Sequence, residues 1–114
     1  MNSLNVNEKT IELDNEGFLL YPEDWNIDVA EMLAAIEKLE LNDARWEVVN
    51  IVRNYFEERQ AVPEARVVLK TLRERHGKDL ATRKYLYSLF PYGYGQQACK
   101  IAGMRKPLKI MLDV

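Results

Sequence analysis

The sequence predicts a mainly α-helical protein, a small orthogonal bundle of about five helices with an N-terminal β-hairpin and an extended C-terminal arm. Apolar residues recur at helical spacing through the middle of the chain, and Pro or Gly falls between those stretches. Two short apolar runs also flank a polar, Gly-containing tetrad near the N-terminus, as in a hairpin. Since two of the connections between helices are short, crossed packing of neighbouring helices is expected.

The N-terminal region is expected to be loose over residues 1–10 and to form the hairpin immediately afterwards. Residues 10–13 and 18–20 are the two short runs, and the polar tetrad between them provides the turn. Pro22 closes this unit, because a proline cannot continue a β-ladder.

The first two predicted helices each begin at a polar cap. Asn26 or Asp28 caps the first, which runs to about residue 39, and Asn42 caps the second. The expected buried face of the first helix comprises Val29, Met32, Leu33 and Ile36. The second has a wide apolar stripe, which belongs in the middle of a bundle; its members are Trp46, Val48, Val49, Ile51, Val52, Tyr55 and Phe56.

The third and fourth helices are bounded by Pro and Gly. Pro63 is placed to occupy the first turn of the third helix, and Gly77 to end it. Asp79 or Thr82 begins the fourth helix, and Pro91 ends it. The expected buried residues are Ala65, Val68, Leu69 and Leu72 in the third helix, and Tyr85, Leu86, Leu89 and Phe90 in the fourth.

A Gly-rich loop at residues 92–95 then leads into a short fifth helix over residues 96–103, which Gly103 terminates. Residues 104–114 contain Pro107 and no helix cap, so they are expected to form an extended arm. The tip of this arm is apolar at Ile110, Met111 and Leu112. An apolar tip is expected to dock into a groove.

Length and composition exclude several classes of protein. The 114 residues are 47% hydrophobic and 30% charged, which is typical of one globular domain over residues 1–114 rather than of a disordered chain. No apolar run approaches ~18 residues, so no membrane insertion is expected. The N-terminus has no signal-peptide pattern. A lone cysteine allows no internal disulfide, and a cytoplasmic location is the simplest expectation.

Charge is divided unevenly along the chain. Residues 1–65 hold 5 Lys/Arg against 15 Asp/Glu, whereas residues 66–114 hold 11 against 3. The basic half carries enough positive charge to bind nucleic acid or an acidic protein, although a solvated surface would have the same composition. The candidate binding residues are Arg83, Lys84, Lys100, Arg105, Lys106 and Lys109.

Cys99 is the residue with the clearest chemical potential, and its sequence context leaves two interpretations open. A position early in a short helix, beside Lys100, would favour a reactive thiolate. Free cysteine is, however, usually a small buried hydrophobic residue. His76 is the only histidine and is expected to be structural, at the end of a helix. No cluster has metal-ligand spacing, and no cofactor is expected.

The C-terminal half resembles the DsrC/TusE family, which comprises gamma-subunit-like proteins of dissimilatory sulfite reductase and their sulfur-relay relatives. The string Arg-Lys-Tyr-Leu-Tyr-Ser-Leu-Phe-Pro at residues 83–91 carries the resemblance, together with Gln-Ala-Cys-Lys-Ile-Ala-Gly at residues 97–103. Lys106-Pro107 and segments 14–18, 46–49 and 52–56 also match, so the resemblance covers roughly residues 11–110.

The resemblance implies a small cytoplasmic carrier that holds sulfur on cysteine as a persulfide or trisulfide. It implies a sulfurtransferase or a siroheme sulfite-reductase-type protein as partner, with the redox chemistry belonging to that partner. The family pattern has two cysteine positions. Cys99 occupies the inner one, and Ile110 stands at the arm position. Without the arm cysteine no internal disulfide or trisulfide can form.

Three functions therefore remain open from the sequence. The first is a sulfur-relay protein in which Cys99 is the only possible persulfide or mixed-disulfide site. The second is a regulatory protein that carries no sulfur and binds nucleic acid or an acidic partner through its basic half. The third is a docking subunit of a sulfite-reductase-like or sulfurtransferase complex. In each case a carrier or accessory protein is expected rather than a stand-alone enzyme.

Overall fold

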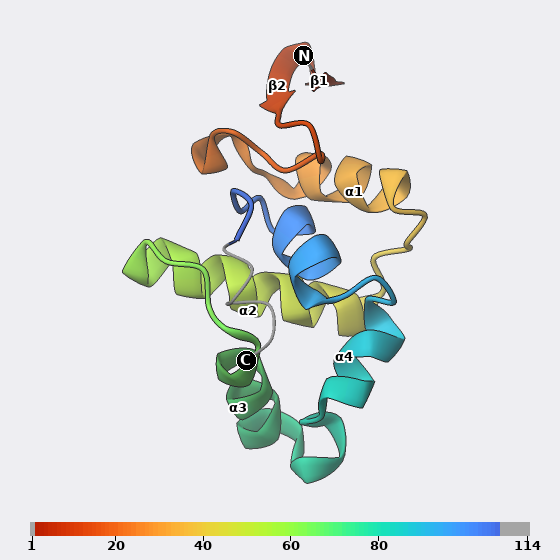
Figure 1. The fold of residues 1–114 in the computed structure, drawn as a ribbon, viewed down its shortest axis with the longest axis vertical. Coiled ribbons are helices and arrows are strands. Elements are labelled where there is room, and N and C mark those ends of the chain that lie inside the picture. Colours follow the sequence, from red (N-terminus) through yellow and green to blue (C-terminus); the bar gives the residue numbers. More distant parts are fainter. Residues whose placement is uncertain (1, 108–114) are drawn as a thin grey trace.

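A computed structural model describes residues 2–107, and the arm tip expected beyond them lies outside the described residues. The described chain is mainly helical, with a two-stranded hairpin at the N-terminus, which confirms the predicted fold class. In Figure 1 the hairpin lies at one end next to α1, α2 crosses the middle, and α3 and α4 form the other end. No helix among the described residues is long and apolar enough to cross a bilayer.

The hairpin begins earlier in the chain than the sequence suggested. Strand β1 (Asn2–Val6) pairs antiparallel with β2 (Lys9–Leu13), so the expectation of a loose segment over residues 1–10 is wrong. Asn7 and Glu8 form the turn with φ of 51° and 69°, the left-handed geometry that suits a tight hairpin. The expected second strand at 18–20 contributes only one bridge, between Leu13 and Leu19.

Helix starts agree closely with the predicted caps. The Asn26 side chain accepts a hydrogen bond from the Val29 amide at the start of α1 (Ile27–Ile36). Asn42 accepts one from the Arg45 amide at the start of α2 (Asp43–Arg59). These side chains satisfy amides that have no partner inside their helix. Helix α1 is shorter than predicted, because the chain leaves it at Glu37 and Lys38 takes a positive φ.

Helix α3 (Ala65–His76) ends at Gly77, which has a φ of +88°. Pro63 lies before α3 rather than in its first turn, because Glu64 is the N-cap; Pro63 is instead buried, and its carbonyl accepts a hydrogen bond. A 3-10 turn, η2 (Lys78–Leu80), leads to α4 (Arg83–Leu89), where Thr82 accepts from the Tyr85 amide. Another 3-10 turn, η1 (Pro22–Asp24), precedes α1.

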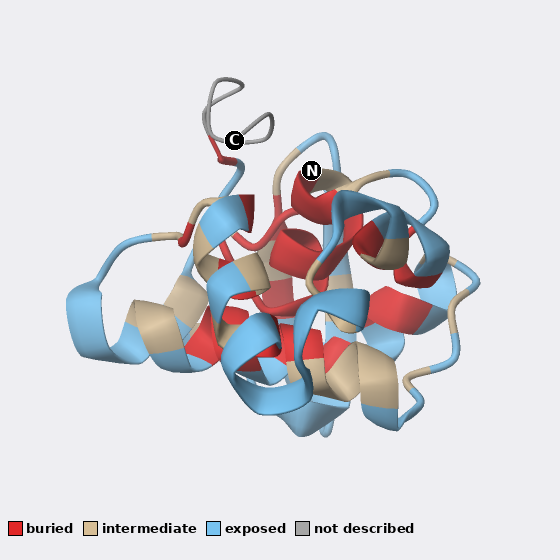
Figure 2. Cartoon of the chain, turned by 90° about the horizontal axis from the view of Figure 1, so that it is seen from below, coloured by how far each residue is buried: buried red, intermediate tan, exposed pale blue. Residues whose placement is uncertain are grey.

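The fifth helical segment lies between α1 and α2 (Figure 1) and forms the centre of the fold. It begins as a π-helical turn, η3 (Tyr94–Cys99), and continues for two α-helical residues before Gly103. Figure 2 shows the buried residues gathered in the interior. Side chains from α1, α2, α3 and α4 and the hairpin pack around this segment, which supplies the fully buried Ala98, Cys99, Ile101, Ala102 and Met104.

The outer face of α1 departs from the predicted pattern. Val29 and Leu33 are buried as expected, but Met32 is 37% exposed and Ile36 is 57% exposed. The helix therefore packs through a narrower stripe than its apolar residues would allow. Two large apolar side chains are left on the surface as a result.

Candidate functional site

Cys99 lies at the end of η3 with none of its surface exposed. Tyr94, five residues earlier, adjoins it, and the Tyr94 hydroxyl donates a hydrogen bond of 2.6 Å to the Pro63 carbonyl. The short connection before α3 thus ties the segment that carries the thiol to the rest of the fold. Of the two interpretations of Cys99, the buried one describes this conformation.

Burial raises the pKa of the Cys99 thiol to about 12, and the nearby Tyr94 hydroxyl offsets only part of this effect. The physical cause is the cost of placing a thiolate in an apolar interior. Burial likewise raises the pKa of Tyr94 well above its ordinary value. At neutral pH the sulfur is therefore a neutral thiol and a poor nucleophile in this conformation.

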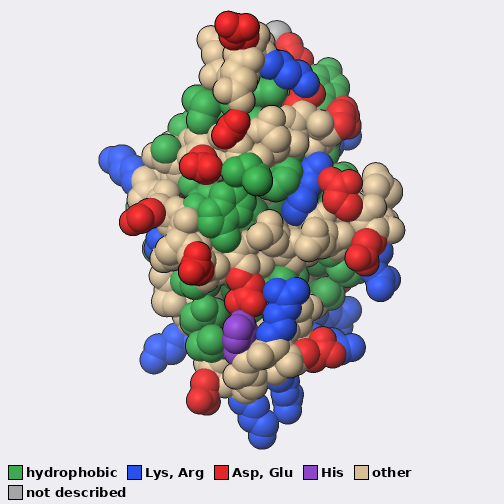
Figure 3. All heavy atoms as spheres, turned by 180° about the vertical axis from the view of Figure 1, so that it is seen from behind, with side chains coloured by type: hydrophobic (Ala, Val, Ile, Leu, Met, Phe, Trp, Pro, Cys, Tyr) green, Lys and Arg blue, Asp and Glu red, His purple; other side chains and the backbone are tan. Residues whose placement is uncertain are grey.

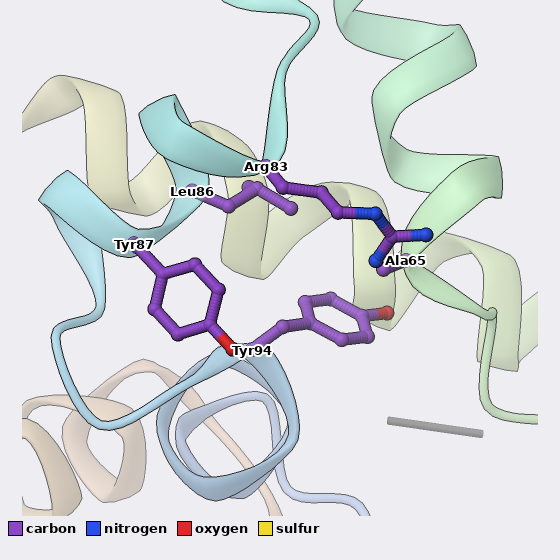
Figure 4. Close-up of a pocket in the computed structure, with 5 residues that line it drawn as sticks. All are labelled: Ala65, Arg83, Leu86, Tyr87 and Tyr94. Carbon is purple, nitrogen blue, oxygen red and sulfur yellow. The ribbon is translucent and has the colours of Figure 1, made fainter. Parts of the chain in front are cut away.

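Tyr94 also faces a hollow on the protein surface. The hollow has a volume of about 20 Å³, roughly one water molecule, and its other lining residues are Ala65, Arg83, Leu86 and Tyr87. In Figure 4 the Arg83 side chain extends across the hollow from α4, and the Tyr94 ring lies on the opposite side. Tyr94 therefore borders both this hollow and Cys99.

The base of the arm, residues 101–104, is held by two side chains that sequence reasoning did not single out. The Trp25 indole donates to the Ile101 carbonyl at 2.8 Å. Arg53 is only 7% exposed and donates to the Ala102 carbonyl at 3.2 Å and to the Pro22 carbonyl at 3.0 Å. The Arg53 guanidinium also lies 4.7 Å from the centre of the Trp25 ring. In the sequence, the one sign of this role is that Arg53 lies within the apolar stripe predicted for the second helix.

Gly103 is required where the arm leaves this base. Its φ is +80°, and a Cβ atom at this position would lie 2.7 Å from Cβ of Trp25. Both the backbone conformation and the close approach of the indole exclude a side chain. The predicted helix terminator is therefore also a packing position.

Lys100, a predicted binding residue, is buried rather than presented to a partner. It is 8% exposed, its ammonium lies 3.5 Å from the Glu37 carboxylate, and it covers the Phe18 ring at 5.0 Å. Gln97 donates to the other oxygen of Glu37 at 3.2 Å. Lys100 and Gln97 therefore anchor this segment to the end of α1, and the expectation of Lys100 as a surface contact is wrong.

The remaining predicted basic residues do not form one group. Arg83 lies at the hollow, Lys84 is exposed on α4, and Arg105 is exposed on the arm. Lys106 is ion-paired with Glu16, and Lys109 lies outside the described residues. Figure 3 shows acidic and basic side chains interspersed on one face of the molecule. This arrangement does not support the alternative of a nucleic-acid-binding protein.

His76 has a structural role at the junction of α2 and α3. Its Nε2 lies 2.8 Å from a carboxylate oxygen of Glu47, and Arg75 donates to the same carboxylate at 3.2 Å. Burial on its own would raise the pKa of Glu47, but the hydrogen bonds from His76 and Arg75 outweigh it and lower that pKa. Among residues 2–107 no group of three His, Cys, Asp or Glu side chains could hold a metal ion.

Comparison with curated proteins finds relatives that match nearly the whole chain. The chain is 41% identical over 108 residues to the Sulfurtransferase TusE homolog of Haemophilus influenzae, covering 95% of this chain and 99% of that protein. It is 39% identical over 101 residues to Sulfurtransferase TusE of Escherichia coli, covering 89% of this chain and 93% of that protein.

Solved structures agree with these relatives. The DsrC structure from Allochromatium vinosum superposes with a TM-score of 0.83 at 41% identity, covering 94% of this chain and 96% of that one. The oxidized gamma-subunit of dissimilatory sulfite reductase from Archaeoglobus fulgidus gives 0.85 at 34% identity, covering 93% and 96%. The family model described as DsrC like protein matches residues 5–111. The resemblance stated from the sequence is thus confirmed, and the chain belongs to the DsrC-like family.

Proposed function

We propose that this protein is an accessory protein of sulfur relay in which Cys99 is the only sulfur acceptor, and that it accepts sulfur after the segment around Tyr94 opens. The observation that carries the proposal is the family match over residues 5–111 in a chain whose only cysteine is Cys99. The relatives named as sulfurtransferases support a sulfur-handling role. The burial of Cys99 supports the requirement for opening.

The proposed chemistry is transfer of one sulfane sulfur without net oxidation. Once exposed, the Cys99 thiolate attacks the outer sulfur of a persulfide on a donor protein. A new S–S bond forms at Cys99, the S–S bond of the donor breaks, and the donor leaves as a thiolate. The proton of the donor persulfide stays on the transferred sulfur, so no oxidant or reductant is needed.

Release of the sulfur must then use a thiol from another protein. Ile110 stands at the position where the resemblance places the arm cysteine, so Cys99 cannot expel its sulfur by forming an internal disulfide. A partner thiolate attacks the terminal sulfur and regenerates Cys99. This favours a sulfurtransferase as partner. A sulfite-reductase-type protein is the second candidate, because the neighbouring structures include a gamma-subunit of that enzyme.

The opening step is proposed because the closed conformation opposes the chemistry. The thiol has no exposed surface and a pKa of about 12. Tyr94 borders the hollow beside Arg83 and also adjoins Cys99, and displacement of its ring is the opening that we propose. A partner that docks at this hollow would supply the energy for that displacement.

Mass spectrometry after incubation with a persulfide-loaded sulfurtransferase tests the proposal. We expect the wild-type protein to gain the mass of one sulfur atom slowly, and Tyr94→Ala to gain it several-fold faster. Tyr87→Ala, which removes a 60% exposed ring from the other side of the hollow, is the matched control and should behave as wild type. Cys99→Ser should gain nothing.

Two results would contradict this proposal. If neither the wild type nor a Tyr94→Ala protein with native circular dichroism acquires sulfur, Cys99 is not an acceptor. If both tyrosine variants load at the wild-type rate, the Tyr94 ring does not control access. In the first case, co-purification with a sulfurtransferase that is lost on deletion of residues 104–114 would indicate a docking subunit that carries no sulfur.

A further inference from the structure

The outer edge of strand β1 is a row of backbone groups that no other strand covers in the described part of the chain. β1 pairs with β2 and has no second strand neighbour among residues 2–107. The hairpin lies at one end of the long axis of the molecule, away from α3 and α4 (Figure 1). An unpaired edge of this kind is a template for the addition of another strand.

The register of the hairpin determines which groups point outward. Because the turn contains two residues, the pair that closes it, Val6 and Lys9, exchanges backbone hydrogen bonds. Hydrogen-bonded and non-hydrogen-bonded pairs then alternate along the antiparallel ladder. Ser3 and Asn5 belong to non-hydrogen-bonded pairs, so their N–H and C=O groups point away from β2.

The other edge of the hairpin supports this register and is covered. Glu12 pairs with Ser3, and its carbonyl accepts a hydrogen bond of 3.2 Å from the Leu20 amide outside the hairpin. A bridge between Leu13 and Leu19 covers the same edge. β2 also carries charged residues, whereas β1 contains neither a charge nor a proline. Charges and prolines are among the features that protect an exposed edge, so the β1 edge is open to pairing.

Contacts with the body of the protein hold the open edge in place. The Asn7 side chain donates a hydrogen bond of 2.6 Å to the Asp28 carboxylate on α1. Lys9 is ion-paired with Asp24 at 3.1 Å. Val6, at the end of β1, is only 5% exposed. The strand therefore presents its outward groups in a fixed geometry, which lowers the entropy cost of pairing with another strand.

An apolar groove adjoins the same strand. Ser3 and Leu4 line it together with Leu33 and Ile36 of α1, and its volume is about 240 Å³. Ile36 is 57% exposed, so an apolar wall of the groove is open to solvent within the described residues. A strand added along β1 would cover part of this apolar surface, and the hydrophobic effect favours that burial.

We propose that β1 pairs antiparallel with β1 of a second copy of this chain, about a two-fold axis at Leu4, so that the two hairpins form one continuous sheet. Ser3 then lies opposite Asn5 of the second copy, and each such pair exchanges its N–H···O bonds. The two Leu4 residues meet at the axis as a non-hydrogen-bonded pair, the position in which cross-strand side chains lie closest.

The occupant is a second copy because β1 is complementary to itself. Its outward-pointing residues, Ser3 and Asn5, lie symmetrically about Leu4, as an interface with two-fold symmetry requires. No charge in Asn2–Val6 opposes its own image across the axis. The pairing involves no sulfur transfer and is independent of the function proposed above.

Sedimentation equilibrium of the full chain at rising concentration tests the pairing. We expect the average mass to rise from that of one chain towards that of two. Ser3→Pro removes an outward N–H without removing a bond between β1 and β2. Because the axis removes this bond from both copies, association should weaken by roughly tenfold. Thr10→Pro is the matched control and should not weaken it, because the N–H of Thr10 points outward from the other edge.

Paired charges test the register itself. A chain with Ser3→Lys and Asn5→Lys places like charges opposite each other at both outward pairs and should remain a monomer. A chain with Ser3→Glu and Asn5→Glu should do the same. An equal mixture of the two chains should associate, because opposite charges then face each other. Both side chains are exposed, and circular dichroism verifies that the fold is retained.

Three results would overturn the proposal. A wild-type chain that remains monomeric at every concentration means that β1 does not pair with a second copy. Association that persists in the chain with two lysines, or that Thr10→Pro weakens as much as Ser3→Pro, means that the interface lies elsewhere. Failure of the oppositely charged chains to associate contradicts the register. Protection of the Ser3 and Asn5 amides from hydrogen exchange that rises with concentration supports the pairing.

Discussion

The base of the C-terminal arm and the outer face of α1 are both rich in apolar residues, but the fold treats them oppositely. Ile101, Ala102 and Met104 are fully buried, and Trp25 and Arg53 hold two of their carbonyls by hydrogen bonds. Met32 and Ile36 on α1 are left on the surface. This chain therefore holds its cysteine-bearing segment closed and leaves large apolar side chains exposed on a neighbouring helix. Substitutions in the arm base and on α1 test this contrast.

The largest effect is expected from Gly103→Ala. A side chain here must accept a φ of +80° and a close approach to Trp25. Left-handed backbone costs ~1–2 kcal/mol and overpacking ~1–3 kcal/mol, so the free energy of unfolding should fall by roughly 2–5 kcal/mol. Urea unfolding measures this loss. Gly77→Ala is the control, because Gly77 has a φ of +88° and open space around it. Its free energy of unfolding should fall only by the cost of the left-handed backbone.

Arg53→Lys should have the second largest effect. The substitution keeps the positive charge but removes the planar fork that reaches both the Ala102 and Pro22 carbonyls. A buried carbonyl left unpaired costs ~1–3 kcal/mol, and we expect a loss of about 2 kcal/mol in the same urea experiment. Arg59→Lys, on the exposed end of α2 over Tyr55, is the control and should change stability little. Equal losses in the two variants would show that Arg53 does not hold the arm base.

Cys99→Ser should cost on the order of 1–2 kcal/mol, because a hydroxyl replaces a thiol in a fully buried position. The raised pKa of the Cys99 thiol also predicts how the stability of the protein depends on pH. Its folded pKa of about 12 lies above the ordinary value of 9.0, so the folded state retains the proton longer than the unfolded state does. This contribution to stability is complete below pH 9 and is lost as the pH rises towards 12.

The measurement is the free energy of unfolding of wild type and Cys99→Ala between pH 8 and about pH 11, a range chosen from the shift in thiol pKa. The wild type should lose more stability over this range than the variant, since other groups titrate in both. Parallel pH curves would show that Cys99 is not held as a buried neutral thiol. Slow alkylation of the native protein by iodoacetamide at pH 8 should accompany the steeper wild-type curve.

The smallest effect is expected on the outer face of α1. Ile36→Lys should change the free energy of unfolding by no more than about 0.5 kcal/mol, because the side chain is mostly exposed. Leu33→Ala, one turn earlier and 2% exposed, should cost ~2–5 kcal/mol. Thermal unfolding of the pair measures the contrast. A large loss for Ile36→Lys would mean that Ile36 belongs to the core of the folded protein.

Local signals explain the parts of the fold that the sequence predicted well. Asn26, Asn42 and Thr82 act as caps because their side chains bond amides within the next three residues, an interaction that requires no distant partner. The displaced hairpin has a local cause as well: Asn7 and Glu8 adopt the left-handed turn, although Glu8 is not a typical turn residue. Pro63 is expected in the first turn of α3, but the helix begins at Ala65 after Glu64, an N-cap residue whose side chain makes no capping hydrogen bond.

The candidate site was less predictable, because its geometry depends on residues far apart in the chain. Cys99 was identified, but its burial follows from packing that no neighbouring residue in the sequence reveals. Arg53 reaches the Ala102 carbonyl across 49 positions, and Trp25 reaches the Ile101 carbonyl across 76. Lys100 resembles a surface charge in the sequence, because its partner Glu37 lies 63 positions away.

Local sequence signals establish the mainly helical class, the positions of the helix caps, the family resemblance and the identity of the only cysteine. These depend on short-range hydrogen bonding, on helical periodicity and on strings of adjacent residues. Tertiary packing is what makes Cys99 a buried, neutral thiol, buries Lys100 and leaves Ile36 facing solvent. Burial and pKa depend on which distant segments pack around a side chain, and one-dimensional periodicity does not specify that packing.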